Sequence, residues 1–409
     1  VLHCAKIIKK KFPNKLLFSG GVNAKSRASI FFAAGFDVVF TSESEISIQQ
    51  VAKIMQKNSS DFSSVGKIYF KKKDGEIVDN SHFGEILMDL DKLPMPAWEL
   101  LPNERYWKIG RPHGGKAKQG EELRYASMMT SRGCPFSCSY CHIAEEIEGS
   151  KSGAIGKFRF KSDDRVIEEL TILKNKIGAK QIFIEDDSIF GMKRRAIRLL
   201  KRIVGFGLDL MDVNGINMIH LVKKSKKPGW MVPDEEVIEL LAEVGFKEIV
   251  LPFESANLRI IKKWCSNKLA LDRFDPGELI KTIKKYKMYV GTNYMLGFPD
   301  ETRKEVEETV KFAKKMQGYG LDHSNFYLVM PVPGTPMFDY CTKNGHLPLD
   351  YNPDRFQWTK ANLKNTNVNP KELEKIRDDA WELCNNEEFK LLRKSWVAGQ
   401  SSKANQQKI

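Results

Sequence analysis

Three of the seven cysteines lie within eight consecutive positions, in residues 131–142. Gly133 and Pro135 favour a tight, non-helical backbone there, so the thiolates of Cys134, Cys138 and Cys141 can turn inward from one loop. Thiolates spaced as C-x3-C-x2-C can bind one iron–sulfur cluster. Three thiolates leave one iron of a 4Fe-4S cluster without a protein ligand, and an open metal position is where chemistry takes place.

Two other uses of these cysteines compete with the cluster. A structural zinc ion needs four ligands, and His142 follows Cys141 too closely to complete the usual C-x2-C and H-x3-H arrangement. A disulfide framework needs an oxidising compartment, whereas the cysteine count is odd and we expect no signal peptide. The cluster is therefore the preferred interpretation, with zinc or unrelated thiols as the alternative.

The same spacing, with the aromatic Tyr140 just before the last cysteine, closely resembles the signature of the radical S-adenosylmethionine (SAM) enzymes. The resemblance implies that the amino and carboxylate groups of SAM chelate the open iron and that Tyr140 lies at the cofactor. An electron from the reduced cluster then breaks a carbon–sulfur bond, giving methionine and a 5′-deoxyadenosyl radical that abstracts hydrogen from a substrate. It also implies an electron donor such as flavodoxin or ferredoxin.

Length and composition limit the class of protein. A chain of 409 residues, 42% of them hydrophobic, is long enough for two domains with ordinary cores. No apolar run approaches the roughly 20 residues that span a bilayer, so we expect a soluble, cytoplasmic protein without a membrane span. The net charge of +14 makes nucleic acid a possible partner, but the lysines are scattered in short groups. Solvated helix faces are favoured, and a small anionic substrate fits the charge equally well.

Residues 1–88 are expected to form a partial doubly wound (Rossmann-like) α/β domain. A helix from Leu2 leads to a strand that ends at Gly20-Gly21, and a strand at residues 37–40 leads to the turn Ser42-Glu43-Ser44-Glu45. This order resembles the latter half of the cobalamin-binding domain of a radical SAM subfamily, whose corresponding turn reads Gly-Glu-x-Glu. The subfamily's histidine-bearing loop, Asp-x-His-x-x-Gly, has no counterpart here. The chain is then either a fragment of a longer protein or a degenerate domain; a start in mid-domain without Met favours a fragment, with cobalamin binding assigned to the parent.

A hairpin and a connector complete this first half of the chain. Residues 65–82 alternate around Asp74-Gly75, which predicts a β-hairpin. Residues 89–121 contain prolines 94, 96 and 102, which forbid a continuous helix and predict an extended inter-domain connector.

Residues 122–345 show repeated strand–helix patterns, which predict a parallel sheet. The resemblance identifies the pattern as the partial (β/α)6 TIM-like barrel of radical SAM enzymes, in which ligands lie at the carboxyl ends of the strands. The six predicted strands are residues 125–130, 181–185, 209–216, 248–253, 289–296 and 324–330. The predicted helices between them include residues 163–176, 193–204, 234–244, 276–286 and 304–316.

The acidic run Glu185-Asp186-Asp187 follows the second of these strands. Carboxylates at a strand end can accept hydrogen bonds from an ammonium group or a ribose, and the family often has two acidic residues there. All three are therefore candidate cofactor-binding residues. The alternative is an exposed acidic cap before the helix at residue 193.

Two further strand ends resemble the family. Glu254-Ser255 closes the fourth strand like the family's Glu-Ser pair, which faces the cofactor, although Ala256 replaces the usual glycine. Gly297 and Pro299 match the family's Gly-x-Pro turn after the fifth strand, where the glycine would let the adenine approach the backbone. Each match is weak alone, because such turns are common, but their order behind the cysteines is informative.

Residues 346–409 are expected to form a helical extension, with a helix from Pro370 to about Trp396 and a polar, disordered end. The leading hypothesis is a radical SAM enzyme that carries out cobalamin-dependent methyl transfer or a radical rearrangement on an unactivated carbon. The alternatives are a cobalamin-independent radical SAM enzyme acting on RNA or a peptide, and a non-enzymatic metal-binding, nucleic-acid-binding protein. The substrate itself is not readable from the sequence.

Overall fold

The computed structural model describes residues 1–109, 123–145, 158–265, 271–349, 351–352, 356–391 and 393. It consists of two compact units, each built from several chain segments. The first unit contains residues 1–95, 131–162 and 331–344, and the second contains residues 96–130, 163–330 and 345–409. The cysteine loop thus belongs to the unit that contains the N-terminal domain, and the predicted sequential domain boundaries stay a prediction.

The first unit contains a four-stranded mixed sheet in the order β1-β2-β3-β4. Strands β1 (Phe18–Ser19) and β2 (Val38–Phe40) are parallel, whereas β3 (Ile68–Lys71) and β4 (Ile77–Asp79) form the predicted hairpin and continue the sheet antiparallel to β2. The hairpin turns at Gly75, whose φ of 94° suits glycine.

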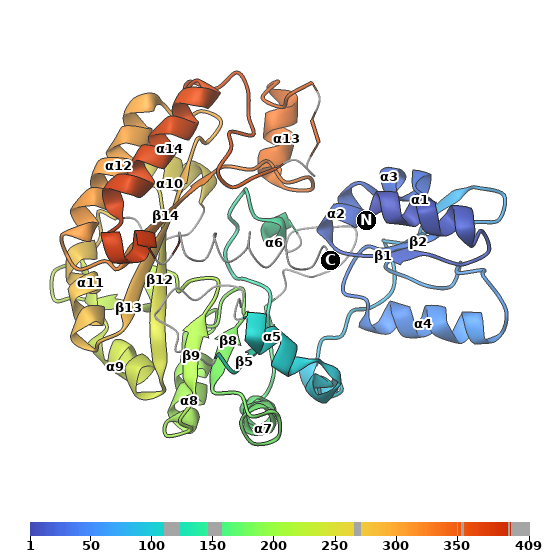
Figure 1. The fold of residues 1–409 in the computed structure, drawn as a ribbon, viewed down its shortest axis with the longest axis horizontal. Helices are drawn as coiled ribbons and strands as arrows, with labels where there is room; N and C mark the ends of the chain where they lie inside the picture. Colours follow the sequence, from blue (N-terminus) through green and yellow to red (C-terminus); the bar gives the residue numbers. More distant parts are fainter. Residues whose placement is uncertain are drawn as a thin grey trace. The chain divides into compact units, whose positions relative to one another are not determined.

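Helices cover both faces of this sheet (Figure 1), namely α1 (Leu2–Lys11), α2 (Val22–Ser26) and α3 (Ala28–Ala33) on one face and α4 (Glu45–Gln56) on the other. Alternation along β2 explains the arrangement: Val39 packs into one apolar cluster with Phe31 and Phe32, while Val38 and Phe40 pack into a second cluster with Val51. The predicted helix from Leu2 and the predicted strands before Gly20 and at residues 37–40 are present, in a sheet that is mixed rather than wholly parallel.

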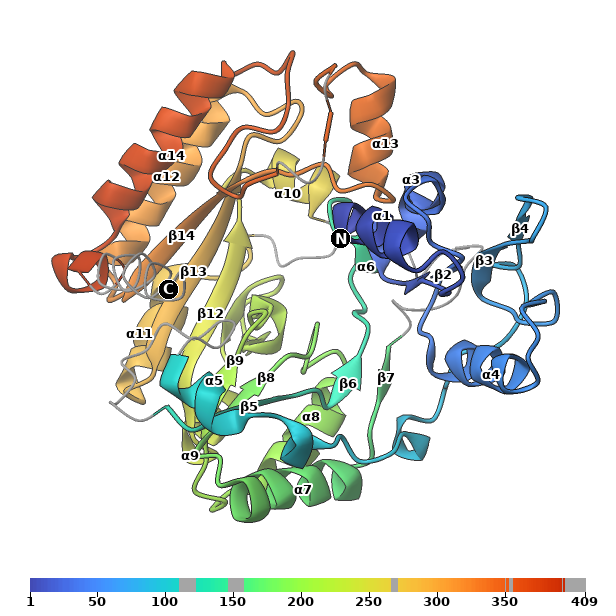
Figure 2. The same ribbon diagram turned by 45° about the vertical axis from the view of Figure 1, so that its right-hand side comes forward.

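The cysteine loop is framed by short elements of the same unit. Strand β6 (Ser131–Arg132) precedes the loop and pairs antiparallel with β7 (Arg159–Phe160) (Figure 2). Helix α6 (His142–Glu145) follows the last cysteine, and α13 (Pro336–Lys343) comes from far along the chain.

The second unit is built on a six-stranded parallel sheet whose order, β14-β13-β12-β9-β8-β5, runs sequentially along the chain. All six predicted strands are present, with ends that differ by a few residues. The strands are β5 (Tyr125–Met128), β8 (Gln181–Ile184), β9 (Asp209–Asp212), β12 (Phe246–Glu254), β13 (Tyr289–Leu296) and β14 (His323–Leu328).

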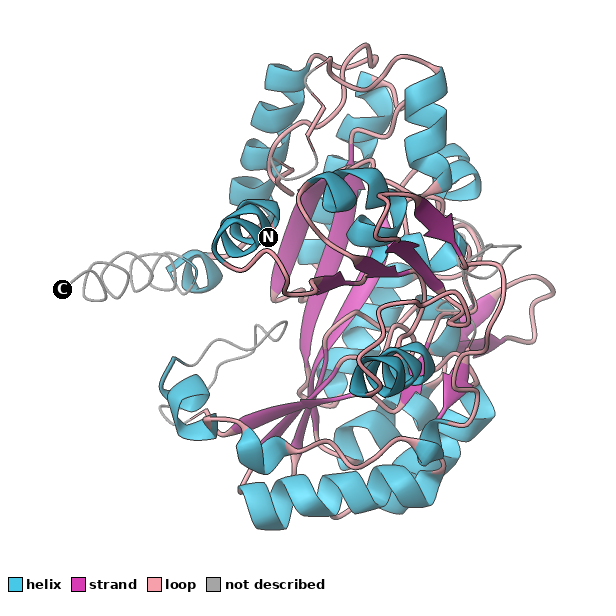
Figure 3. Cartoon of the chain, turned by 90° about the vertical axis from the view of Figure 1, so that its right-hand side faces the viewer, coloured by secondary structure: helices cyan, strands magenta, loops and turns pink. Residues whose placement is uncertain are grey.

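Helices run along the outer side of this sheet (Figures 1 and 3). They are α7 (Asp163–Ile172, continued by a π-helical turn, Leu173–Ile177), α8 (Lys193–Ile203), α9 (Glu235–Glu243), α10 (Leu258–Trp264), α11 (Pro276–Lys285) and α12 (Arg303–Gln317). A small antiparallel pair, β10 (Val222–Lys224) and β11 (Met231–Pro233), lies between β9 and α9. The unit also contains α5 (Asn103–Ile109). Within the described residues, no helix is both long and apolar enough to cross a membrane.

The C-terminal segment completes the barrel unit. Helix α14 (Pro370–Cys384) packs on β14 and α12, where the helix that follows the sixth strand of a β/α repeat would lie. The predicted helix to Trp396 is wrong in its continuity, because Asn385 is extended (φ −116°, ψ 145°) and its buried side-chain amide bonds the backbone N–H and C=O of Ser324 at 2.8 and 2.9 Å. Helical residues resume at 387–391, and Trp396 lies outside the described residues. The predicted disordered end lies outside the described residues.

Candidate cofactor site

The cysteine loop leaves β6 through Gly133, whose φ of 83° is a conformation that a residue with a side chain rarely adopts. The backbone N–H of Cys141 donates to the carbonyl of Cys138 at 2.9 Å, which makes a tight turn between the last two cysteines. Cys138 is buried, Cys134 and Cys141 are partly exposed, and all seven cysteines of the chain are thiols. Tyr140 is half-buried beside them.

This donor set fits an iron–sulfur cluster. In the part of the chain that the structure describes, no three His, Cys, Asp or Glu side chains are arranged to hold one metal ion. A cluster does not require that arrangement, because each of its thiolate ligands binds a separate iron. Three thiols on one short loop, two of them accessible, match that requirement.

The loop is supported by α13, a contact that the sequence analysis missed. Thr335 caps this helix by accepting a hydrogen bond from the Phe338 N–H at 3.2 Å, and the N–H of the residue before, Met337, donates to the carbonyl of Ser139 at 2.9 Å. The proline- and glycine-containing turn of residues 331–336, which follows the sixth strand, thus leads into a helix that donates a hydrogen bond to the cysteine loop.

The acidic run after β8 is divided between the two faces of the sheet. Glu185 is half-buried and accepts a hydrogen bond from the exposed Ser127 hydroxyl at 3.1 Å. Ser127 is paired with Phe183 in the β5–β8 register, and alternation places Glu185 on that same face, opposite the outer helices. Asp187 is half-buried in the loop that follows.

Asp186 points to the other face. Its carboxylate accepts hydrogen bonds from the N–H and the hydroxyl of Thr130 at 2.6 and 2.7 Å, and it is 1% exposed. Arg195, a fully buried residue of α8, donates to the hydroxyl and the carbonyl of Thr130 at 2.9 and 3.2 Å. Asp186 therefore joins the end of β5 to β8 and to an outer helix, which is a structural task.

Asp212, at the end of β9, lies close enough to Asp186 to feel its charge. Burial, and then the negative charge of Asp186, raises the pKa of Asp212 to about 8. Asn214 is a second residue that the sequence analysis missed: its amide donates to the carbonyls of Glu185 and Asp186 at 3.2 and 3.0 Å. The signal for such a turn was the Asn-Gly pair of residues 214 and 215.

Glu254 closes β12 in a left-handed conformation, with φ 63°, and its side chain is buried. A glutamate in the left-handed conformation has a strained backbone, and residues with such strain cluster at functional sites. The register of β12 shifts between Pro252 and Glu254, so the strand bulges at this residue. Burial raises the pKa of Tyr327, and the negative charge of Glu254 adds to the rise, which places the carboxylate near the inner face of β14.

Ser255 has a different environment. Its fully buried hydroxyl lies 3.3 Å from the Thr309 hydroxyl of α12 and accepts a hydrogen bond from the Asn257 N–H at 3.1 Å. The pair Glu254-Ser255 thus combines a strained acid with a hydroxyl that organises the start of α10.

The Gly-x-Pro turn after β13 is stabilised by a carboxylate of the same segment. Glu301 is buried and accepts hydrogen bonds from the N–H groups of Gly297 and Phe298 at 2.6 and 3.2 Å. It lies just before α12, which begins at Arg303 with Thr302 as its capping residue. Burial raises the pKa of Glu301 to about 8.

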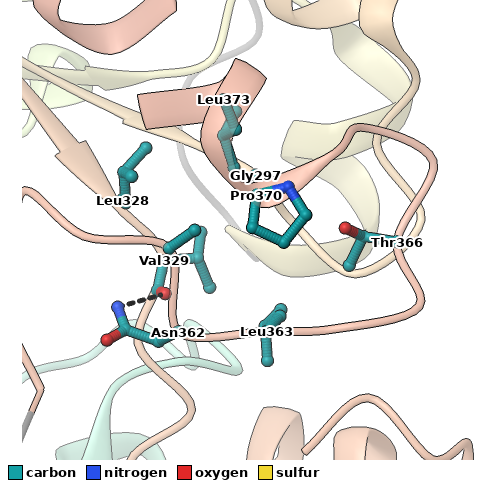
Figure 4. Close-up of a pocket in the computed structure, with 9 residues that line it drawn as sticks. Gly297, Leu328, Val329, Asn362, Leu363, Thr366, Pro370 and Leu373 are labelled. Atoms are coloured by element: carbon teal, nitrogen blue, oxygen red, sulfur yellow. Dashed lines mark hydrogen bonds between the residues drawn. The ribbon is translucent and has the colours of Figure 1, made fainter. Parts of the chain in front are cut away.

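The glycine of this turn is explained by packing. A Cβ on Gly297 would lie 2.4 Å from Cδ2 of Leu373 in α14, and φ is 83° there. Gly297 and Leu373 line a pocket with Leu328, Val329 and Asn362, whose amide donates to the Val329 carbonyl at 3.1 Å (Figure 4). Its volume of about 10 Å³ is the space of about one water molecule. The role of Gly297 and of the buried Pro299 at an adenine stays a prediction.

The inner face of the last two strands carries polar side chains that the sequence analysis missed. The Asn325 amide donates to the Asn293 carbonyl oxygen at 3.0 Å. Tyr294 and Phe326 stack on the opposite face at 5.1 Å, where Tyr294 also meets Phe312 of α12. Tyr327 is half-buried on the same face as the two asparagines. Glu185, Ser127 and these residues make the inner surface of the sheet polar.

A six-stranded sequential parallel sheet, preceded by a mixed α/β sheet and interrupted after its first strand by a three-cysteine loop, defines a partial-barrel iron–sulfur protein. The sequence profile of the radical SAM superfamily matches residues 128–313. An uncharacterized methyltransferase of Pyrococcus horikoshii is 31% identical over 354 residues, which are 84% of this chain and 66% of the relative. The cytidylyl-2-hydroxyethylphosphonate methyltransferase of Streptomyces wedmorensis is 26% identical over 266 residues, 63% of this chain and 44% of the relative.

Solved structures share the fold. The radical SAM methyltransferase TsrM of Kitasatospora setae, with tryptophan and a SAM analogue bound, superposes with a TM-score of 0.60 at 15% identity, over 84% of this chain and 61% of its own. The cobalamin-dependent radical SAM enzyme OxsB gives 0.62 at 12% identity, over 91% and 54%. The chain belongs to the radical SAM superfamily. It spans 66% and 44% of the lengths of the two curated relatives.

Proposed function

We propose that this chain is the catalytic part of a cobalamin-dependent radical SAM methyltransferase. The observation that carries the proposal is the loop of three thiols, Cys134, Cys138 and Cys141, in a chain whose relatives at 31% and 26% identity are methyltransferases. When a 4Fe-4S cluster and SAM are bound, the cluster supplies the electron that cleaves a carbon–sulfur bond of SAM. A flavodoxin or ferredoxin is the class of protein that would deliver that electron.

The side chains at the strand ends have separate tasks in this proposal. Glu254 is the leading cofactor ligand, because a buried carboxylate in a strained conformation is suited to bind an ammonium group. Glu185 is the second, on the inner face, and Asp187 follows it in the loop. Asp186 and Ser255 position the strand ends through Thr130 and Thr309.

Two observations of the N-terminal domain fit a cobalamin. Thr41 and Ser42 follow β2 at its carboxyl end, are buried, and their hydroxyl groups have no hydrogen-bond partner among the described residues. Buried hydroxyl groups without partners are rare in folded proteins and indicate a bound group or water. A Cβ on Gly21, at the end of β1, would meet nothing within 4 Å. Carboxyl ends of parallel strands are where such α/β domains bind ligands, and the amide groups of a corrin can pair with hydroxyl groups.

The substrate is proposed to be a small, polar molecule. The amides of Asn293 and Asn325 and the hydroxyl of Tyr327 offer hydrogen bonds on the inner face of the sheet. The positive charge of the chain, +14, favours an anionic group on that molecule.

The test is anaerobic reconstitution with iron and sulfide, followed by measurement of visible absorbance, iron content and 5′-deoxyadenosine formed from SAM. Cys138→Ala is expected to lose the cluster absorbance and the product, whereas Cys4→Ala, which removes an exposed cysteine outside the loop, keeps both. Full iron content in Cys138→Ala would overturn the cluster assignment. An absorbance titration with hydroxocobalamin tests the second cofactor, with Thr41→Val expected to weaken binding.

A further inference from the structure

Two arginines stand directly opposite each other on the strands that carry the cysteine loop. Arg132 of β6 pairs with Arg159 of β7 in the antiparallel register, and Cys134 follows Arg132 by two residues. Like charges facing each other across a strand pair are destabilising unless a counter-charge lies between them. Any shift of these strands moves the loop that starts there.

Glu43 supplies the counter-charge to both arginines. Its Oε2 lies 2.8 Å from Nη1 of Arg132 and 3.0 Å from Nη1 of Arg159, and its Oε1 accepts a further bond from Nη2 of Arg159. Oε1 of Glu45 accepts a further hydrogen bond from Nη1 of Arg132 at 2.7 Å. Two carboxylates thus neutralise two guanidinium groups.

The network is shielded from solvent. The side chains of Arg159 and Glu43 are 4% and 10% exposed, and those of Arg132 and Glu45 are 24% and 28% exposed. Arg159 also donates from Nη1 to the carbonyl of Leu87 at 2.5 Å. A shielded charge that loses its partner destabilises its surroundings much more than an exposed one, so these side chains hold a defined geometry.

We propose that Glu43 and Glu45 are positioning residues for the iron–sulfur cluster, acting through Arg132 and Arg159. This inference rests on the proposed function. It gives the turn Ser42-Glu43-Ser44-Glu45 a task other than contact with a cobalamin, because the carboxylate oxygens of Glu43 are bonded to the arginines. The turn at the end of β2 thereby fixes the strand from which the first cluster ligand emerges.

The experiment uses the full-length, anaerobically reconstituted protein and compares Glu43→Gln with Glu76→Gln. Glu76 lies on the β3–β4 hairpin of the same unit, where it makes an exposed ion pair with Lys72, so it serves as a matched control. Iron and sulfide content, the rate at which a chelator removes iron, and the electron paramagnetic resonance (EPR) spectrum of the reduced cluster with and without SAM are measured. Thermal unfolding and the affinity for hydroxocobalamin are followed in parallel.

Glu43→Gln is expected to lose iron to the chelator about tenfold faster than the control, the ratio that corresponds to one lost charge-assisted hydrogen bond. Its EPR signal should broaden or change its response to SAM, while hydroxocobalamin affinity stays at the control value. Glu45→Gln should show a smaller effect, since among the described residues the Glu45 carboxylate bonds one of the two arginines, Arg132. Arg159→Lys keeps the positive charge but not the forked pair of donors, so its rate of iron loss should lie between those of the wild type and Glu43→Gln.

Three results would overturn the inference. One is a chelator rate and spectrum of Glu43→Gln equal to those of Glu76→Gln. Another is loss of hydroxocobalamin affinity with an unchanged cluster, which would make Glu43 a cobalamin residue. The third applies if Glu43→Gln does not fold: a cluster unaffected in both Glu45→Gln and Arg159→Lys. A wild-type protein that assembles no cluster would instead refute the proposed function.

Discussion

Neutralising Asp186 tests the division of the acidic run into structural and cofactor-binding residues. In Asp186→Asn the side chain keeps its shape but loses the charge that accepts from the Thr130 N–H and hydroxyl at 2.6 and 2.7 Å. Hydrogen bonds to charged groups contribute about 1.5–3 kcal/mol and neutral ones about half as much, so two weakened bonds cost about 1.5–3 kcal/mol in the free energy of unfolding. The buried Arg195 beside Thr130 loses a nearby counter-charge, which adds to this cost.

The matched variant is Glu185→Gln, one residue earlier. Glu185 is half-buried and contacts the exposed Ser127, so its neutralisation should change the free energy of unfolding by about 0.5 kcal/mol or less. It should instead weaken SAM binding, because its carboxylate faces the inner side of the sheet. The two variants therefore separate stability from ligand binding.

The assay is urea unfolding followed by tryptophan fluorescence, combined with SAM titration of the reconstituted protein. With a slope of about 3 kcal/mol per molar urea, Asp186→Asn should unfold at a midpoint about 0.5–1 M lower than the wild type. An unchanged midpoint for Asp186→Asn, together with weaker SAM binding, would refute the structural role of Asp186 and indicate that it binds the cofactor.

Two further predictions concern Glu254 and Asp212. Glu254→Gly should be about 1 kcal/mol more stable than Glu254→Ala in denaturant unfolding, because glycine relieves the strain at φ 63°, yet both variants should lose 5′-deoxyadenosine formation; equal stabilities would argue against strain there. The pKa of Asp212 is raised to about 8 in the folded chain from its ordinary value of 3.8, so between these two pH values the folded state keeps a proton on this carboxyl group that the unfolded state has already released. This group's contribution therefore lowers the free energy of unfolding as pH rises from 4 to 8, by at most about 1.4 kcal/mol per pH unit. Asp212→Asn should flatten that part of the profile, which chemical unfolding at pH 5, 6, 7 and 8 would show; a profile parallel to that of the wild type would contradict the burial of this carboxyl group.

The strands of the barrel were predictable because each is a short apolar run between helix signals. Strand β13 was predicted with its observed bounds, Tyr289–Leu296, and the other five differ only at their ends. Helix α14 was predicted to continue to Trp396, but the chain becomes extended at Asn385. Its amide bonds a strand 61 residues earlier in the chain, a contact that no local pattern contains.

The candidate site also combines features that the sequence predicted with features that it did not. The Glu185-Asp186 pair was recognised by position, but its two members point to opposite faces, and only their partners show which face each one occupies. Asp186 bonds Thr130, 56 residues away, and Glu43 bonds Arg159, 116 residues away. Long-range pairs of this kind depend on the packing of elements, which composition and spacing do not specify.

The sequence by itself indicated the chemistry of the cysteine loop, because Cys134, Cys138 and Cys141 are candidate ligands from one local segment whose spacing favours an iron–sulfur cluster over zinc. It also determined the six parallel strands, since each is a short, largely apolar run between helix signals. Only the tertiary structure decided which carboxylates support the strand ends, that Gly297 packs against Leu373, and that Glu43 neutralises two facing arginines beside the loop. These contacts depend on which residues, distant in the sequence, are buried next to each other. A buried charge needs a nearby counter-charge or hydrogen-bond partner, and a glycine is required where a neighbouring side chain leaves no room for a Cβ.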